Sequence, residues 1–167
     1  MRRSEAPETR QRILEAAGEI FAEQGFRNTT VRDICHLAGA NIAAVNYHFG
    51  DKQALYLEVL RYAHHCSEEQ YPPNLGLLPD PTPPERLHAF VRSFLLRIFD
   101  TGRPAWHGKL VSREMIEPTG ALDMIVDEDI RPRAQALHAI VRSIIGRKAK
   151  QEEVWHCALS VVSQCLF

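Results

Sequence analysis

The sequence predicts an all-α protein with two helical parts. Apolar residues recur at helical spacing in every long segment, and no segment sustains the period-two alternation of a half-buried strand. A stretch at residues 71–84 holds six of the ten prolines and separates the two parts. We predict an N-terminal domain over residues 1–50, a connecting helix over 51–70 and a second domain over 71–167.

The N-terminal part predicts four helices. The first runs from Thr9 to Gln24, ends at Gly25 and carries one apolar stripe: Ile13, Leu14, Ala17, Ile20 and Phe21. Thr30 is the expected cap of a short second helix that ends at Gly39. Two further caps open the third and fourth helices: Asn41 before residues 42–48 and Asp51 after the break at Gly50.

The second part predicts further helices. The first opens at Pro83 or Pro84 and has the strongest apolar stripe of the chain: Leu87, Phe90, Val91, Phe94, Leu95, Ile98 and Phe99. Another begins at Pro104 and closes at Pro118 and Gly120. The next starts at Ala121 and reaches Gly146, with a kink or break expected at Pro132. The last stripe starts at Val154 and runs to the chain end without a polar cap, so we expect this helix and its domain to be incomplete at the C-terminus.

Composition places the chain among soluble globular proteins. Its 167 residues are 45% hydrophobic and 25% charged, with a formal net charge of −1. No apolar run has the length of a membrane helix, and the charged start Met1–Pro7 is not followed by the apolar stretch of a secretory signal. We therefore expect a cytoplasmic protein whose four cysteines are reduced. Near-neutral charge also argues against a protein that coats nucleic acid through bulk charge.

Two short helices joined by a glycine-containing turn, residues 30–38 and 41–48, predict a helix-turn-helix. Its second helix presents small and polar residues, as a helix entering a major groove requires. Ala43 and Ala44 allow close approach to a thymine methyl, and Asn46 suits a bidentate contact to adenine. Val45 and Phe49 are expected to face the helices behind.

Residues 9–60 resemble the DNA-binding domain of the TetR family of bacterial transcriptional regulators. The matching segments include TRQRILEAA from Thr9, FAEQGF from Phe21, TTVRDI from Thr29, AGAN from Ala38 and YHFGDKQALY from Tyr47. The second domain is similar to the CecR-type branch at Arg113-Glu114-Met115 and Glu117-Pro118. The resemblance implies a three-helix DNA-binding domain followed by a helical domain for ligand binding and dimerisation.

The resemblance also implies roles in DNA binding. Phosphate contacts fall to Thr30, Tyr47, His48 and Lys52, with Arg27, Asn28 and Arg32 close enough in the sequence to add to them. Base reading falls to Asn41, Ile42, Ala43, Ala44 and Asn46, although many members have Gly and Tyr where this chain has Ala43 and Asn46. The alternative for Tyr47 is packing against the fourth helix, and for Lys52 a solvated helix start. We expect further contacts from Arg2, Arg3, Arg10 and Arg12.

The predicted function is that of a ligand-responsive homodimeric repressor that binds a palindromic, double-stranded DNA operator. We expect the dimer to form through the helices at residues 136–145 and 153–167, the alternative being an ordinary core. A small-molecule effector of unidentified chemistry is expected in a pocket whose candidate lining is Phe90, Phe94, Trp106, His107, Met115, Met124 and His138. The alternative for these residues is again core packing.

Rival functions are a helical module that binds a small molecule or a protein without regulatory DNA binding, and an enzyme. An enzyme needs paired titratable groups in a cleft, and the closest match is Asp123 and Asp127 at helical spacing. Without a matching motif on a second helix, a solvated acidic face is favoured. We predict no enzymatic activity, no cofactor, no metal and no membrane partner.

Overall fold

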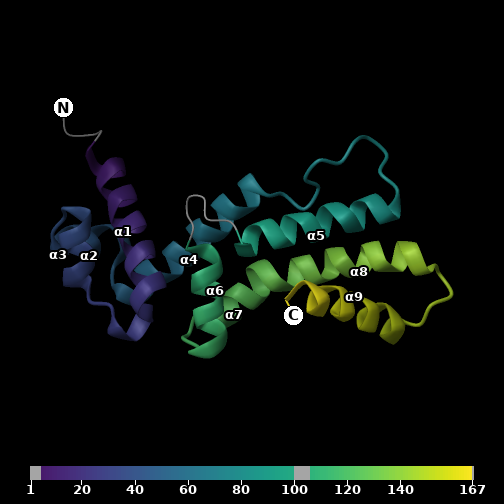
Figure 1. Ribbon diagram of the computed structural model, residues 1–167. Coiled ribbons are helices and arrows are strands. Elements are labelled where there is room, and N and C mark those ends of the chain that lie inside the picture. The colour runs from purple at the N-terminus through teal and green to yellow at the C-terminus, as the bar shows by residue number, and fades with distance from the viewer. Residues whose placement is uncertain (1–4, 100–105, 167) are drawn as a thin grey trace. The chain divides into compact units, whose positions relative to one another are not determined.

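The computed structural model describes residues 5–99 and 106–166, which form helices joined by turns and loops without a strand (Figure 1). The predicted all-α fold is confirmed. None of the helices in these ranges is long and apolar enough to cross a membrane. The chain divides into two compact units, and the first contains residues up to Ser67 together with a later segment, 101–122. The second contains residues 68–100 and 123–167. The predicted boundaries gave residues 71–167 to the second domain, whereas the structure groups the later segment, 101–122, with the N-terminal part.

The first unit is built from α1 (Glu5–Asn28), α2 (Val31–Ala38), α3 (Ile42–Phe49), most of α4 (Lys52–Gln70) and α6 (His107–Ile116). Three predicted caps are confirmed. The side chains of Thr30, Asn41 and Asp51 accept from the backbone amides of Asp33, Ala44 and Ala54. The predicted stop at Gly25 is a sharp break within α1, because this residue has φ 80° and ψ 164°.

The core of the first unit gathers the apolar stripes of α1 and α4 around α2 and α3. Its fully buried side chains include Ile13, Leu14, Phe21, Ile34, Val45, Leu55 and Val59. Phe21, Phe26 and Tyr56 form an aromatic cluster, with ring centroids 4.8 to 6.0 Å apart. Offset and edge-to-face ring contacts of this kind favour one fixed orientation of α1 on α4.

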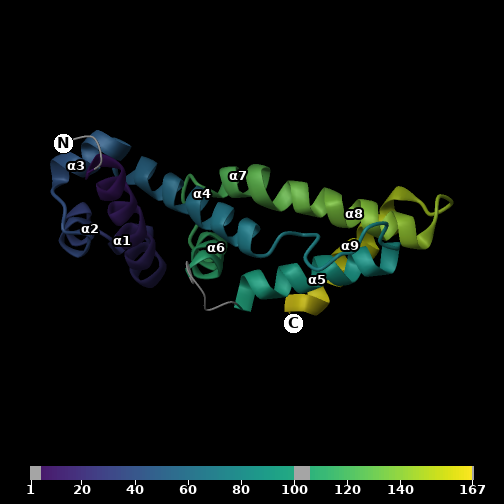
Figure 2. The same ribbon diagram turned by 90° about the horizontal axis from the view of Figure 1, so that it is seen from above.

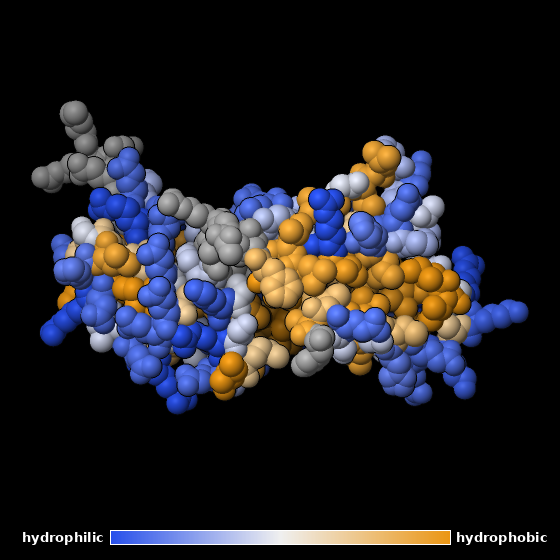
Figure 3. Space-filling model, in the orientation of Figure 1, coloured by the Kyte–Doolittle hydropathy of each residue, from blue (hydrophilic) through white to orange (hydrophobic). Residues whose placement is uncertain are grey.

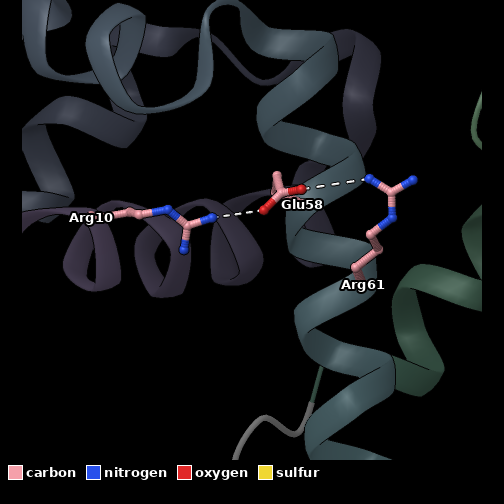
Figure 4. A network of polar contacts seen from close by, with 3 residues as sticks. All are labelled: Arg10, Glu58 and Arg61. Carbon is pink, nitrogen blue, oxygen red and sulfur yellow. Dashed lines mark hydrogen bonds and ion pairs between the residues drawn. The ribbon is translucent and has the colours of Figure 1, made fainter. Parts of the chain in front are cut away.

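An ion-pair network joins α1 to α4 on the surface of the first unit (Figure 4). Arg10 donates to the carboxylate of Glu58 at 2.7 Å, and Arg61 lies 3.5 Å from the other carboxylate oxygen. The guanidinium of Arg10 also lies 5.1 Å from the ring centre of Phe49, at the end of α3. Arg10, from which a further DNA contact was expected, therefore contacts α3 and α4 within the protein.

The second unit contains α5 (Pro83–Phe99), α7 (Leu122–Ile125, whose first residue belongs to the other unit), the π-helix η1 (Val126–Ile130), α8 (Arg131–Ile145) and α9 (Gln151–Leu166). Helix α8 packs along both α5 and α9, as the two ribbon views show (Figures 1 and 2). Their shared core consists of Phe90, Leu137, Val141, Val154 and Ala158.

The kink or break expected at Pro132 takes the form of a π-helical turn. Arg131 N–H bonds to the carbonyl of Val126, one residue further back than in an α-helix, and the helix then continues through Pro132. A wider turn relieves the clash between a proline ring and the preceding carbonyls. The turn also carries Asp129, which is buried and pairs with Arg133 on the next turn.

The buried face of α5 differs from the predicted stripe. It is formed by Ala89, Phe90, Ser93 and Arg97, whereas Phe99 is 70% exposed. The second unit also exposes apolar side chains on later helices: Ile130, Ile144, Ile145, Leu159 and Leu166. A wide apolar area is visible over this unit in Figure 3. Contiguous exposed apolar surface of this kind is typical of a contact surface.

Candidate nucleic-acid interface

The turn between α2 and α3 has the geometry of a helix-turn-helix. Gly39 adopts the left-handed conformation at φ 60°, which a side chain disfavours, and Ala40 N–H bonds back to Cys35 O at 3.0 Å. Asn41 then caps α3 through Oδ1, which accepts from Ala44 N–H at 2.8 Å. The chain thus reverses in three residues, and the buried side chains of Ile34 and Val45 fix α3 against the helices behind it.

Helix α3 has one face in solvent and one in the core. Val45 and Phe49 are buried, as predicted, while Ile42, Ala43, Asn46 and Tyr47 are exposed. These four positions follow the spacing i, i+1, i+4 and i+5, so they share one side of the helix. Tyr47 is 83% exposed, which excludes packing against α4 in the described chain. An exposed helix face that combines small, amide and aromatic side chains matches the requirements of a major groove.

The N-terminus of α3 has backbone amides that are free to bind an acceptor. Asn41 satisfies Ala44 N–H, which leaves the amides of Ile42 and Ala43 without an intrahelical acceptor. The first turn of α3 contains no acidic residue, so the positive end of the helix dipole is uncompensated. Such an end is a ready site for a DNA phosphate.

The N-terminus of α2 differs, because the carboxylate of Asp33 accepts hydrogen bonds there. Thr30 and Asp33 form a capping box in which the Thr30 hydroxyl donates to Asp33 Oδ2 at 2.6 Å and accepts from Asp33 N–H at 3.2 Å. The hydroxyl proton of Thr30 is therefore used within the protein. The amides of Val31 and Arg32 are the remaining donors of this helix start.

Lys52 holds the start of α2 in position. Its Nζ donates to Phe26 O and to Thr29 O, both at 2.9 Å, and lies 4.4 Å from the ring centre of Phe26. Neither a free phosphate-binding lysine nor a solvated helix start describes this environment. An ammonium has three donors, so one N–H of Lys52 remains for a phosphate.

The remaining carbonyls at the end of α1 are also satisfied by side chains. Arg113 of α6 donates from Nε to Ala22 O at 2.8 Å and from Nη2 to Glu23 O. The hydroxyl of Thr29 donates to Gly25 O at 2.7 Å. Gly25 O also accepts from Thr29 N–H at 3.3 Å, whereas the carbonyls of Ala22 and Glu23 just before the break are bonded by Arg113, so α6 supplies part of the cap at this break in α1.

The next residue of α6 attaches the same helix to α4. Glu114 is 1% exposed and accepts from Tyr56 Oη at 2.7 Å, from Thr119 N–H at 3.0 Å and from Thr119 Oγ1 at 2.9 Å. Burial and the bond to this carboxylate raise the pKa of Tyr56 well above its usual value, so the phenol stays a donor. Trp106, just before α6, packs on Gly18 of α1, where an added Cβ would lie 2.3 Å from the indole ring.

These α6 contacts were missed as functional features. The sequence singled out Arg113 and Glu114 only as a branch resemblance. The available signal was the adjacent charged pair Arg113 and Glu114 within a helix that also carries apolar residues at helical spacing. Charged side chains in such a helix are buried only when they are paired.

The structure places the predicted DNA-binding residues in one unit, on α3 and around its neighbouring helix ends. Exposed members are Arg27, Asn28, Thr30, Arg32, Asn41, Ile42, Ala43, Asn46 and Tyr47, and partly buried members are Ala44, His48 and Lys52. Among the additional arginines, Arg10 is paired with Glu58, while Arg2 and Arg3 lie outside the described residues.

The predicted effector residues are divided between the two units. Phe90 and Phe94 line a small pocket of the second unit, and Phe90 is also part of its core. In the same unit, His138 contacts Trp155 with its ring tilted and the ring centroids 4.5 Å apart, and Met124 is partly buried. Trp106 and Met115 belong to the first unit, where Trp106 packs on Gly18 and Met115 is 66% exposed. The side chain of His107 lies outside the described residues.

One member of the acidic pair considered for a metal, Asp127, forms an ion pair instead. Asp127 accepts from Arg131 at 2.7 Å, and Asp123 is exposed. Across residues 5–99 and 106–166, no three His, Cys, Asp or Glu side chains are grouped as metal ligands.

Two family models match the chain. Residues 13–59 match "Bacterial regulatory proteins, tetR family", and residues 83–167, just over half of the chain, match "HTH-type transcriptional dual regulator CecR, C-terminal domain". The dual regulator CecR of Shigella flexneri is 29% identical over 150 residues, which cover 83% of this chain and 66% of that protein. The regulator SrpR of Pseudomonas putida is 40% identical over 74 residues, covering 44% of this chain and 35% of that protein. The chain thus spans less than two thirds of either relative.

Solved structures share the fold at low identity. PfmR of Thermus thermophilus, a TetR family transcriptional regulator, has a TM-score of 0.69 at 21% identity, with 93% of this chain and 82% of that chain covered. AibR, solved in complex with isovaleryl coenzyme A and operator DNA, has a TM-score of 0.71 at 20% identity, with 95% and 84% covered. The relatives are named as transcriptional regulators and not as enzymes. With the helix-turn-helix geometry and both family models in agreement, the chain belongs to the TetR family of bacterial transcriptional regulators, with a CecR-type C-terminal domain.

Proposed function

We propose that this regulator is a ligand-responsive, homodimeric repressor that binds a palindromic operator through α3. The observation that carries the proposal is the exposed face of α3, where Ile42, Ala43, Asn46 and Tyr47 stand together beside an uncompensated helix N-terminus. Large apolar side chains on an otherwise polar surface, here Ile42 at 46% and Tyr47 at 83% exposure, are consistent with a surface that is covered when the protein acts.

Base reading is assigned to the middle of this face. The side-chain amide of Asn46 can donate to N7 of adenine and accept from the N6 amino group of the same base. Ala43 permits close approach to a thymine methyl. Ile42 adds apolar contact at the helix start. Ala44 and Asn41 complete the predicted set, with Asn41 using Oδ1 internally and keeping its Nδ2 donors.

Phosphate binding is assigned to helix starts and to cations. The amides at the N-termini of α2 and α3, the exposed Arg27 and Arg32, and the third donor of Lys52 are the candidates, together with Tyr47 and His48. Residues 1–65 carry eight basic and eight acidic side chains, so positive potential depends on where charges lie and not on their sum. We expect the logarithm of the DNA association constant to fall linearly with the logarithm of the salt concentration, with a slope of about −0.9 for each phosphate neutralised.

Dimer formation is assigned to the apolar surface of the second unit. Leu159 and Leu166 on α9 and Ile144 and Ile145 on α8 are 41% to 60% exposed, and exposed apolar side chains gathered on one unit are typical of a contact surface. A two-fold dimer with its two α3 helices on successive major grooves, about 34 Å apart, predicts a palindromic site.

Ligand response is assigned to α6. This helix lies in a segment of the first unit, residues 101–122, which the chain places between two segments of the second unit. Its contacts with α1 and α4 through Arg113 and Glu114 fix the helices that support α2 and α3. An effector that binds one conformation of the second unit more tightly can change the position of α6 through the chain segments on either side of it. The fraction of molecules able to bind DNA then changes. The AibR complex, which holds both isovaleryl coenzyme A and operator DNA, supports such a dual role.

Fluorescence anisotropy with operator DNA and with random DNA of equal length tests the base-reading assignment. Asn46→Ala is expected to lower operator affinity by about 1–3 kcal/mol, the value of one bidentate base contact, and to leave affinity for random DNA unchanged. The matched control is Asn74→Ala, at an exposed position of the second unit, which is expected to change neither affinity. Equal losses on both DNAs in Asn46→Ala, or no binding of DNA by the parent chain, would contradict the proposal and favour a protein-binding adaptor.

A further inference from the structure

A surface arginine of the first unit is held at two points beside α3. Arg10 on α1 donates from Nη2 to Glu58 Oε2 at 2.7 Å, and its guanidinium carbon lies over the ring of Phe49, 5.1 Å from the ring centre. Glu58 belongs to α4, and Phe49 is the last residue of α3. A guanidinium that is both ion-paired and placed on an aromatic ring has fewer orientations than a free arginine side chain. Arg10 therefore keeps a defined position on the outside of the unit.

The ion pair leaves most of this guanidinium open to solvent. The side chains of Arg10 and Glu58 are 42% and 38% exposed. A guanidinium has five N–H donors, and the ion pair uses one of those on Nη2. Among the described residues, Glu58 is the hydrogen-bond acceptor of Arg10, as Figure 4 shows. An acceptor that approaches from solvent can thus bind the guanidinium without displacing Glu58.

Ring contacts connect Arg10 to the exposed face of α3. The ring centre of His48 lies 6.1 Å from that of Phe49 and 5.0 Å from that of Tyr47. Arg10 thus lies beside the last turn of α3, whereas the free backbone amides of this helix are at its first turn. The eight residues of α3 span about 12 Å, and a major groove is about 12 Å wide between its two phosphate backbones. Donors beside both ends of α3 are therefore suited to phosphates of both strands.

Glu58 has two opposite effects on a phosphate bound by Arg10. Its carboxylate repels the phosphate, and Arg61 offsets part of this charge from 3.5 Å. Its hydrogen bond orients Arg10, so less side-chain entropy is lost when DNA binds. Replacement of the carboxylate by an amide separates the two effects, because an amide oxygen still accepts from Nη2 and carries no charge.

We propose that Glu58 is a positioning residue for DNA binding, which orients Arg10 toward a phosphate beside the last turn of α3 while Phe49 supports the guanidinium. The inference rests on the proposed function, in which α3 enters a major groove. It gives Glu58 a part in DNA binding in addition to its part in joining α1 to α4.

Fluorescence anisotropy with a random DNA duplex at several salt concentrations tests the phosphate contact. Arg10→Met is expected to make the plot of log association constant against log salt less steep by about 0.9, the value for one phosphate. Relative to 1 M salt, this slope corresponds to binding roughly eightfold weaker at 0.1 M. The matched control Arg61→Met removes the other arginine beside Glu58 and is expected to keep the parent slope. A parent slope in Arg10→Met overturns the proposal.

Two substitutions of Glu58 test the positioning. Glu58→Gln and Glu58→Ala remove the same charge, but only the first keeps an acceptor for Arg10. Glu58→Ala is expected to bind the duplex about three- to tenfold more weakly than Glu58→Gln, the cost of immobilising one long side chain. In the Arg10→Met background the two substitutions are expected to give equal affinities, because Glu58 acts through Arg10. If circular dichroism shows that Glu58→Ala is unfolded, Glu58→Met, which keeps the apolar stem, replaces it.

Two outcomes of this comparison overturn the proposal. Equal affinities of Glu58→Gln and Glu58→Ala in the parent background show that the hydrogen bond does not position Arg10. A difference that persists without Arg10 shows that Glu58 supports only the packing of α1 on α4. Absence of DNA binding by the parent chain is a separate result, which refutes the proposed function itself, whatever the variants do.

Discussion

Substitution of Arg113 by Met tests whether α6 holds the DNA-binding helices. The change removes the donors to Ala22 O and Glu23 O while keeping an apolar stem of similar length. Hydrogen bonds to a charged group contribute about 1.5–3 kcal/mol where water cannot replace them. Ala22 is buried and Glu23 is exposed, so water replaces the second bond and the first dominates. We expect a loss of about 2–3 kcal/mol in the docking of α6 on α1, which is roughly a 30- to 150-fold rise in the opening equilibrium.

Hydrogen–deuterium exchange read by mass spectrometry measures this opening directly. Local opening exposes amides in proportion to its equilibrium constant when reclosing is fast. Peptides covering the last two turns of α1 and the length of α6 are expected to exchange roughly 30- to 150-fold faster in Arg113→Met. Peptides of α9, in the second unit, are expected to keep their rates and serve as an internal reference.

The matched control is Lys109→Met, which removes an exposed cation from the same helix. It is expected to leave exchange in α1 unchanged. The reasoning is refuted if α1 keeps its parent exchange rates in Arg113→Met, or if Lys109→Met accelerates them equally. Operator affinity is expected to fall in Arg113→Met and to be unaffected in Lys109→Met, because only the first loosens the support of α2 and α3.

Three further predictions concern other contacts. Lys52→Met removes two donors from the turn before α2, so we expect a lower melting temperature in addition to equal losses of affinity on operator and random DNA; unchanged melting would contradict the internal role of Lys52. The raised pKa of Tyr56 means that its contribution to stability is complete below pH 10, the ordinary tyrosine value, and is lost as pH rises further. Urea unfolding should therefore show a shallower decline of stability above pH 10 in Tyr56→Phe than in the parent, whereas Tyr47→Phe, at an exposed position, should match the parent; identical slopes in all three would contradict it. Leu159→Glu places a charge on the exposed face of α9, so light scattering at micromolar concentration should show a dimer for the parent and a monomer for the variant; a parent monomer would contradict the proposed assembly.

Local signals predicted the helix-turn-helix well. Thr30, Asn41 and Asp51 cap the helices that follow them, because short polar side chains reach the free amides two or three residues ahead in any sequence context. Gly39 ends α2 in a conformation that glycine adopts most easily. The exposed and buried sides of α3 follow from the helical period alone, which is why Val45 and Asn46 were placed correctly.

Long-range polar contacts escaped prediction because they depend on which helices meet. Arg113 reaches carbonyls about ninety positions away, and Tyr56 donates to a glutamate 58 positions along the chain. The buried face of α5 was predicted only in part, with Phe90 buried as expected, for a related reason. Apolar spacing favoured Ile98 and Phe99, whereas Arg97 lies inside, where Tyr71 O accepts from it. The π-turn at Val126–Ile130 likewise follows from Pro132 being held inside a packed helix instead of ending it.

Selection of bound fragments from random double-stranded DNA by the full chain tests the central claim most directly. The proposal that two copies of α3 read adjacent major grooves predicts enrichment of one palindrome, with half-site centres about one helical turn apart. It also predicts that Asn46→Ala, put through the same selection, relaxes the preference at symmetric positions of that palindrome while Asn74→Ala returns the parent site. Failure to enrich any sequence, or an enriched site that Asn46→Ala leaves unchanged, would contradict the assignment of DNA reading to the exposed face of α3.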